Sequence, residues 1–210
     1  MLEFGVAGRI APGERISGDL EVVHYYDGGG GALVAAIDGI GHGEQAAATA
    51  RLAADTILRH PEEEPAALLT RCHAALRGTR GVVLSIASID LRQAALSWLG
   101  IGNVSGVVCR GTATVVAARD ELLARPGVVG YGELPALHAS VISLRARDML
   151  IFATDGISRH FSDDLASGAS AQSLADDIVA HHCRRNDDAL VVVARASYTA
   201  HAHERDTSAT

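Results

Sequence analysis

Two apolar segments of the chain each end in the dipeptide Asp-Gly. Residues Leu33–Ile37 lead into Asp38-Gly39, and Leu150–Thr154 lead into Asp155-Gly156. In each case an apolar strand places a carboxylate at its end, and the glycine lets the backbone turn tightly or approach a ligand closely. A single Asp-Gly is typical of a turn. Its repetition after two apolar strands indicates carboxylates with a shared role.

Acidic residues also stand at two further predicted strand ends. Asp19 follows Ser17-Gly18 at the start of one strand, and Asp187-Asp188 immediately precede the last strand. Carboxylate oxygens are the ligands that hard divalent cations such as magnesium and manganese prefer. Each acidic position alone could belong to a turn or loop. Together the four positions predict a metal centre.

The pattern of apolar residues predicts an α+β framework for these acids. Helical spacing predicts helices over residues 43–59, 66–78 and 171–183. Strands are predicted over residues 20–26, 32–37, 81–90, 94–101, 104–109, 112–117, 138–144, 149–154 and 189–196. A glycine-rich hairpin loop is expected at 27–31 and an irregular segment at 119–135. Strands that are apolar on both faces favour a two-sheet sandwich with helices outside.

The composition favours one domain with no nucleic-acid or membrane partner. With 210 residues, 48% of them hydrophobic, the chain can bury one core, which we expect over residues 1–196, with a flexible tail over 197–210. The formal charge of −7 argues against a nucleic-acid partner. No apolar run approaches the roughly 20 residues of a membrane span.

Several residue types are missing or too few for other enzyme classes. All 18 basic residues are arginine, so Schiff-base lysines and lysine-dependent phosphate loops are excluded. The three cysteines, at positions 72, 109 and 183, are odd in number and far apart, which favours reduced thiols that pack in the interior. The first residues also lack the pattern of a secretory signal. These features predict a cytoplasmic protein.

Four short motifs resemble, in order and spacing, those of the metal-dependent PPM protein phosphatases. They are Ser17-Gly18-Asp19, Asp38-Gly39-Ile40-Gly41-His42-Gly43, Ala153-Thr154-Asp155-Gly156-Ile157 and Asn186-Asp187-Asp188-Ala189-Leu190. Within this family the chain resembles the bacterial SpoIIE-type branch, and especially its small stressosome phosphatases. Residues 71–81, 100–104 and 130–132 add to that resemblance, which extends from residue 2 to about 195.

The resemblance implies a fold, a cofactor and a set of ligands. The fold would be an α-β-β-α sandwich of two antiparallel sheets flanked by helices, with two divalent cations, Mn²⁺ or Mg²⁺, at one end. Asp38 would bridge both cations and the reacting water, and Asp188 would lie behind the ligands. The other ligands would be Asp155 and Asp187 for one cation, and Asp19 and the Gly39 carbonyl for the other. Two such cations activate water for in-line attack on phosphorus, without help from cysteine or lysine.

Two candidate residues depart from the family pattern. Arg15 lies four residues before Asp19, close to the place from which an arginine holds phosphate in many relatives. The alternative for Arg15 is an ordinary surface position. His42 lies four residues beyond Asp38 instead of two and is a candidate proton donor, with helix capping or packing as the alternative. Asn103, in a glycine-rich turn, is expected to be structural.

The resemblance implies a phosphoserine/phosphothreonine protein phosphatase with phosphorylated STAS-domain stressosome proteins as substrates. The alternatives are a phosphatase of an anti-anti-sigma factor and a non-catalytic pseudophosphatase, although a degenerate site would be expected to lose an aspartate. A metallohydrolase built on His181-His182 lacks the required His-Asp dipeptide. The sequence does not fix the oligomeric state, and a monomer is expected.

Overall fold

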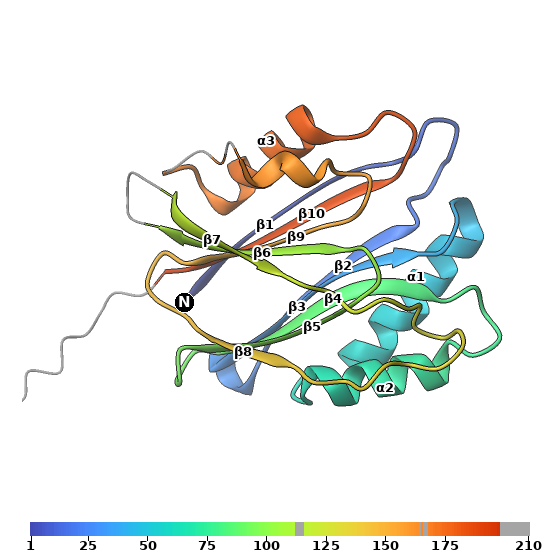
Figure 1. Ribbon diagram of the computed structural model, residues 1–210, viewed down its shortest axis with the longest axis horizontal. Helices are drawn as coiled ribbons and strands as arrows, with labels where there is room; N and C mark the ends of the chain where they lie inside the picture. Colours follow the sequence, from blue (N-terminus) through green and yellow to red (C-terminus); the bar gives the residue numbers. More distant parts are fainter. Residues whose placement is uncertain (112–115, 164, 166–167, 198–210) are drawn as a thin grey trace, which may run out of the picture.

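The protein is a four-layered sandwich of helices and sheets (Figure 1). The structure is a computed structural model and describes residues 1–111, 116–163, 165 and 168–197. Within these residues, two five-stranded antiparallel sheets face each other. Helix α3 (Ala171–His182) covers one sheet, and helices α1 (Gly43–Leu58) and α2 (Pro65–Ala75) cover the other. The predicted α-β-β-α sandwich is confirmed.

The order of the strands places three pairs of strands that are not consecutive in sequence next to each other, β1 with β10, β9 with β6 and β5 with β8. The first sheet has the order β1-β10-β9-β6-β7. Its strands are β1 (Leu2–Arg9), β10 (Ala189–Ala196), β9 (Met149–Ala153), β6 (Ser105–Gly111) and β7 (Val116–Leu122). The second sheet has the order β2-β3-β4-β5-β8. Its strands are β2 (Asp19–Tyr26), β3 (Gly31–Gly39), β4 (Val82–Asp90), β5 (Ala95–Ile101) and β8 (Ser140–Ser143).

The central strands are buried on both faces. Val34, Val108 and Phe152 belong to the apolar layer between the sheets. The opposite faces pack against the helices, as Ile37 does beside α1 and Ile151 beside α3. This two-sided burial explains why these strands are almost entirely apolar instead of alternating.

The predicted helices and most of the predicted strands are confirmed, with small shifts at their ends, but the first sheet differs at both edges. Strand β1 was not predicted as a separate element. The predicted strand over residues 112–117 falls mostly outside the described residues. Strand β7 continues to Leu122, so the prediction of an irregular segment from Arg119 was wrong at its start. Edge strands tolerate the polar residues that suggested irregular structure there.

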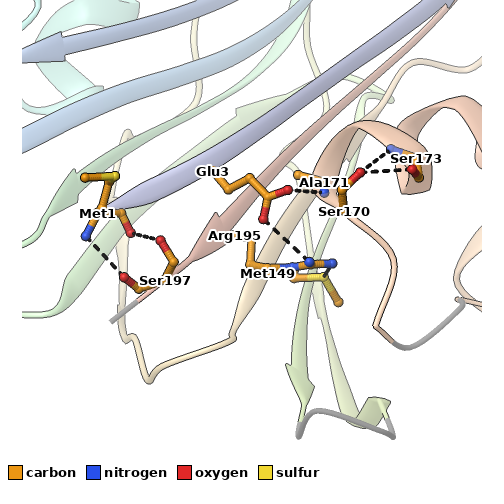
Figure 2. A network of polar contacts seen from close by, with 8 residues as sticks. All are labelled: Met1, Glu3, Met149, Ser170, Ala171, Ser173, Arg195 and Ser197. Atoms are coloured by element: carbon orange, nitrogen blue, oxygen red, sulfur yellow. Dashed lines mark hydrogen bonds and ion pairs between the residues drawn. The ribbon is translucent and has the colours of Figure 1, made fainter. Parts of the chain in front are cut away.

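Strand β1 is fastened to β10 and to the start of α3 (Figure 2). The Met1 carbonyl accepts hydrogen bonds from the backbone and side chain of Ser197, at 2.9 and 2.8 Å. Glu3 accepts a 2.8 Å hydrogen bond from the Ala171 amide and forms an ion pair of 3.6 Å with Arg195. These contacts hold the start of β1 in place.

Two short 3₁₀ helices, Asp27–Gly29 and Arg159–Ser162, follow β2 and β9 among the described residues. No helix in the described part of the chain is long and apolar enough to cross a membrane. Residues 198–210, the greater part of the predicted tail, lie outside the described residues.

Candidate active site

The predicted aspartates come together at one end of the sandwich. Asp19 begins β2 and stands opposite Asp38 in the antiparallel β2–β3 pair. Asp155 follows β9, and Asp187-Asp188 precede β10, the partner of β9. The Thr154 hydroxyl donates a 2.7 Å hydrogen bond to Oδ2 of Asp19, which joins the two sheets at this point. Strand ends from both sheets therefore contribute to one site.

A cleft of about 690 Å³ opens at this end of the molecule. Asp38, Asp155 and Asp187 line it, and so do Glu14 and His42. The remaining lining residues are Ala11, Pro12, Ile40, Gly41, Val83, Gly102, Asn103, Pro126, Gly127 and Asn186. The wall is thus rich in oxygen ligands and open to a substrate.

Close packing by α1 fixes the backbone around Asp38. A Cβ atom on residue 39 would stand 2.3 Å from the Ala46 carbonyl oxygen, so only glycine fits where the helix meets the strand end. The Gly39 amide donates to the Gly18 carbonyl at 3.1 Å, and the Ile40 amide donates to the Gly81 carbonyl at 3.1 Å. Asp38 therefore sits on a backbone held from both sides.

Asp188 holds both ends of the loop between β1 and β2. Its Oδ1 accepts the Ala11 amide and its Oδ2 accepts the Gly18 amide, each at 2.8 Å. The residue is only 4% exposed. Its carboxylate oxygens point at the loop, and the residue does not line the cleft. This loop carries Glu14 and leads directly into Asp19.

Thr154 and Asn103 orient two of the aspartates. Thr154 donates to Asp19, as described above, and its oxygen accepts the Leu190 amide at 2.9 Å. Asn103 donates from Nδ2 to Oδ2 of Asp155 at 2.8 Å. Neither role could be predicted from the sequence, in which Thr154 has no expected role and Asn103 is expected to be structural, because the partners are far apart along the chain.

Burial and mutual repulsion raise the pKa values of the clustered carboxyl groups. Burial, and to a smaller extent the charges of Asp19 and Asp155, raise the pKa of Asp38 to about 8. Burial likewise raises the pKa of Asp19 to about 7, opposed by the Thr154 hydrogen bond. The pKa of Asp187 is raised by burial and by Asp155. Carboxylates in such a cluster favour protonation unless a cation offsets their charge.

The donor set fits hard divalent cations that keep part of their water shell. None of the ion pairs among the described residues involves Asp19, Asp38, Asp155, Asp187 or Asp188. No three His, Cys, Asp or Glu side chains in the described ranges are grouped closely enough to enclose a single ion, so Asp38, Asp155 and Asp187 would have to move closer together to share one. Magnesium is commonly bound through one or two carboxylates and several waters, which suits an open acidic cleft of this kind.

The two other candidate residues, His42 and Arg15, differ in their position relative to the cleft, which only His42 lines. His42 precedes α1 without capping it, and its Nδ1 shares a 2.6 Å hydrogen bond with Oε1 of Glu14. Glu14 fits there because residue 43 is glycine at φ +70°, and a Cβ atom would stand 2.7 Å from Oε2. Arg15 is exposed and does not line the cleft. Glu14 was not predicted as a site residue, because the sequence around it carries no local signal of such a role.

None of the three cysteines lines the cleft. Cys72 and Cys109 are buried, and burial raises the pKa of these thiols to about 12 and about 11. Burial also raises the pKa of Cys183. A thiol held in its protonated form is a poor nucleophile, as expected for packing residues.

Comparisons with known proteins agree with the fold and the motifs. The family described as Stage II sporulation protein E (SpoIIE) matches residues 28–197. The phosphoserine phosphatase RsbX of Bacillus subtilis (strain 168) is 21% identical over 168 residues, which are 79% of this chain and 81% of RsbX.

Solved structures share the whole sandwich. RsbX in complex with magnesium has a TM-score of 0.81 at 20% identity, covering 93% of this chain and 96% of RsbX. A structure from work on the bacterial stressosome as a modular system has a TM-score of 0.81 at 29% identity, covering 93% of this chain and all of that one. The PP2C phosphatase domain of Bacillus subtilis SpoIIE gives 0.78 at 20% identity, covering 93% of this chain and 63% of that structure. The chain therefore belongs to the SpoIIE family of PPM-type phosphatases.

Proposed function

We propose that the chain is a phosphoserine/phosphothreonine protein phosphatase that works with two divalent cations, Mn²⁺ or Mg²⁺, in the acidic cleft. The observation that carries this proposal is the convergence of aspartates from both sheets with no basic partner among the described residues. Clustered carboxylates of this kind are costly to a fold unless they bind cations. Family membership supports the same chemistry.

Each aspartate has a distinct task in this proposal. Asp38 would be the shared ligand of both cations. The separate ligands would be Asp155 and Asp187 for one cation, and Asp19 and the Gly39 carbonyl for the other. Thr154 donates a hydrogen bond to one oxygen of Asp19, and Asn103 donates one to one oxygen of Asp155. The second oxygen of each aspartate would then bind a cation. When bound, the cations would lower the pKa of a water and offset charge on the phosphoryl group.

His42 is the candidate proton donor for the seryl or threonyl oxygen that leaves. Its Nδ1 is engaged by Glu14, so Nε2 is the atom free to deliver a proton. Both residues line the cleft that the substrate would enter.

Phosphorylated STAS-domain proteins of a stressosome are the proposed substrates, and the cytoplasm is the proposed location. The likeness to RsbX, named a phosphoserine phosphatase, and to a structure from stressosome work supports this choice. A phosphorylated anti-anti-sigma factor is the alternative substrate within the same chemistry.

The test measures hydrolysis by metal-stripped protein to which Mn²⁺ or Mg²⁺ is added back separately. Inorganic phosphate should be released from the phosphoserine of a phosphorylated STAS-domain scaffold protein when either cation is added, and EDTA should abolish the release. Full activity in metal-free protein would refute the metal-dependent mechanism. Metal binding without turnover of any phosphoserine or phosphothreonine substrate would indicate a pseudophosphatase.

A further inference from the structure

The cleft wall offers a phosphorylated substrate almost no positive charge from the protein. Four carboxylates line it, namely those of Glu14, Asp38, Asp155 and Asp187, and no arginine of the described residues does so. A phosphoryl group brings up to two negative charges. Cations bound by the aspartates would offset part of that charge, but phosphoryl oxygens turned toward the opening of the cleft would still need donors.

One arginine, Arg80, lies against the rim of this wall. A Cβ atom on Gly41 would stand 2.7 Å from Nη1 of Arg80, so the guanidinium lies directly over the glycine. Gly41 lines the cleft and adopts φ +102°, a conformation that favours glycine. Because residue 41 has no side chain, the guanidinium of Arg80 can lie next to the cleft.

The backbone of Arg80 is fixed to the loop that carries Asp38. The carbonyl of Gly81 accepts the Ile40 amide at 3.1 Å, and the Gly81 amide donates to the Thr79 hydroxyl at 3.0 Å. Gly81 adopts φ +81°, and a Cβ atom there would stand 2.6 Å from the Val129 carbonyl oxygen. The position of Arg80 relative to Asp38 is therefore set by backbone contacts.

The side chain of Arg80 is free to bind an anion. Arg80 is exposed, and no carboxylate forms an ion pair with it in the described part of the chain. Arginine presents a planar set of donors that matches two phosphate oxygens at once. Arg15, by contrast, is exposed on the β1–β2 loop and does not line the cleft.

We propose that Arg80 binds the phosphoryl group of the substrate through oxygens that face the opening of the cleft. This inference rests on the proposed phosphatase function and assigns the phosphate contact to Arg80 instead of Arg15. The charge that Arg80 supplies also opposes the repulsion that the acidic wall exerts on an approaching phosphate.

The test compares Arg80→Gln and Arg80→Lys with the exposed controls Arg77→Gln and Arg15→Gln. For Arg80→Gln, KM should rise about tenfold or more for both a phosphoserine peptide and p-nitrophenyl phosphate. Inhibition by inorganic phosphate should weaken by a similar factor, while calorimetric Mn²⁺ affinity stays unchanged. Lysine should restore part of the loss, because it keeps the charge without the paired donors.

Three results would overturn the assignment of Arg80. They are unchanged KM values, a loss confined to the peptide substrate, and an equal loss in Arg77→Gln or Arg15→Gln. If the wild type hydrolyses neither substrate, the proposed function fails, and calorimetric binding of inorganic phosphate to the Mn²⁺-loaded proteins then decides the role of Arg80 separately. Equal phosphate affinity in wild type and Arg80→Gln would refute it.

Discussion

At the scale of single residues, the carboxylate of Asp188 organises the loop from which two other acids extend. Replacing it in Asp188→Ala leaves the amides of Ala11 and Gly18 without their acceptor. We expect a loss of about 1–3 kcal/mol in the free energy of unfolding, measured in urea. Turnover should also fall, because Asp19 and Glu14 depend on this loop. Asp55→Ala, on the exposed side of α1, is the control, and equal behaviour of the two variants would contradict the role of Asp188.

The pair formed by Glu14 and His42 predicts a dependence on the leaving group. p-Nitrophenolate leaves without protonation near neutral pH, whereas a seryl oxygen needs a proton. Glu14→Gln and His42→Gln should therefore lower kcat for a phosphoserine peptide at least about tenfold, yet change kcat for p-nitrophenyl phosphate little. Equal losses on both substrates would assign the pair to binding or folding instead.

The sequence was informative about the acids but not about the groups that hold them. Asp19, Asp38, Asp155 and Asp187 could be found because each stands at the end of an apolar strand. Thr154 bonds to Asp19 from 135 residues away and Asn103 to Asp155 from 52 residues away. Hydrogen bonds of such range leave no local pattern, and they become visible only once the two sheets are in register.

At the scale of elements, glycine lets α3 approach β1. A Cβ atom on Gly5 would stand 2.1 Å from the Ala171 carbonyl oxygen. Gly5→Ala should therefore push the start of α3 away and lower the free energy of unfolding by about 1–3 kcal/mol or more. The control is Gly30→Ala, where the atoms nearest to a Cβ atom belong to the flexible end of Arg92. Equal unfolding midpoints for the two variants in urea would show that α3 adapts without cost.

The glycines of β1 also explain why this strand was hard to predict. Gly5 and Gly8 interrupt the apolar pattern of this strand, and glycine lowers strand propensity. In the structure, β1 is stabilised by its full pairing with β10 and by the contacts of Glu3, both of which are long-range. Helix α1 was predictable for the opposite reason, since its stripe of alanines is local and periodic.

At the scale of the whole molecule, the acidic cleft links stability to pH and to metal. The pKa values of Asp19 and Asp38 are about 7 and about 8, against an ordinary value of 3.8. Between about pH 4 and about pH 8 the folded metal-free protein binds more protons than the unfolded chain. Its free energy of unfolding should therefore fall as pH rises through this range. Urea unfolding in EDTA across this range measures the fall.

Divalent cations should reverse that trend. Because they bind the carboxylates that protons leave, the stabilisation produced by added Mg²⁺ should be larger at pH 8 than at pH 5.5. Asp38→Asn should flatten the pH dependence of the metal-free protein, since it removes the group with the higher pKa. Stability that rises with pH in EDTA, or a Mg²⁺ effect independent of pH, would contradict the coupling.

The central claim, that these aspartates hold the catalytic cations, is tested most directly by Asp38→Asn. The substitution keeps the size of the side chain and removes the charge that two neighbouring cations would share, so their mutual repulsion is no longer offset. Calorimetric titration with Mn²⁺ should show the stoichiometry falling from two ions toward one or none, and phosphoserine hydrolysis should fall by several orders of magnitude. The exposed control Asp55→Asn should match wild type in both. Wild-type Mn²⁺ binding and turnover in Asp38→Asn, or equal losses in Asp55→Asn, would contradict the account.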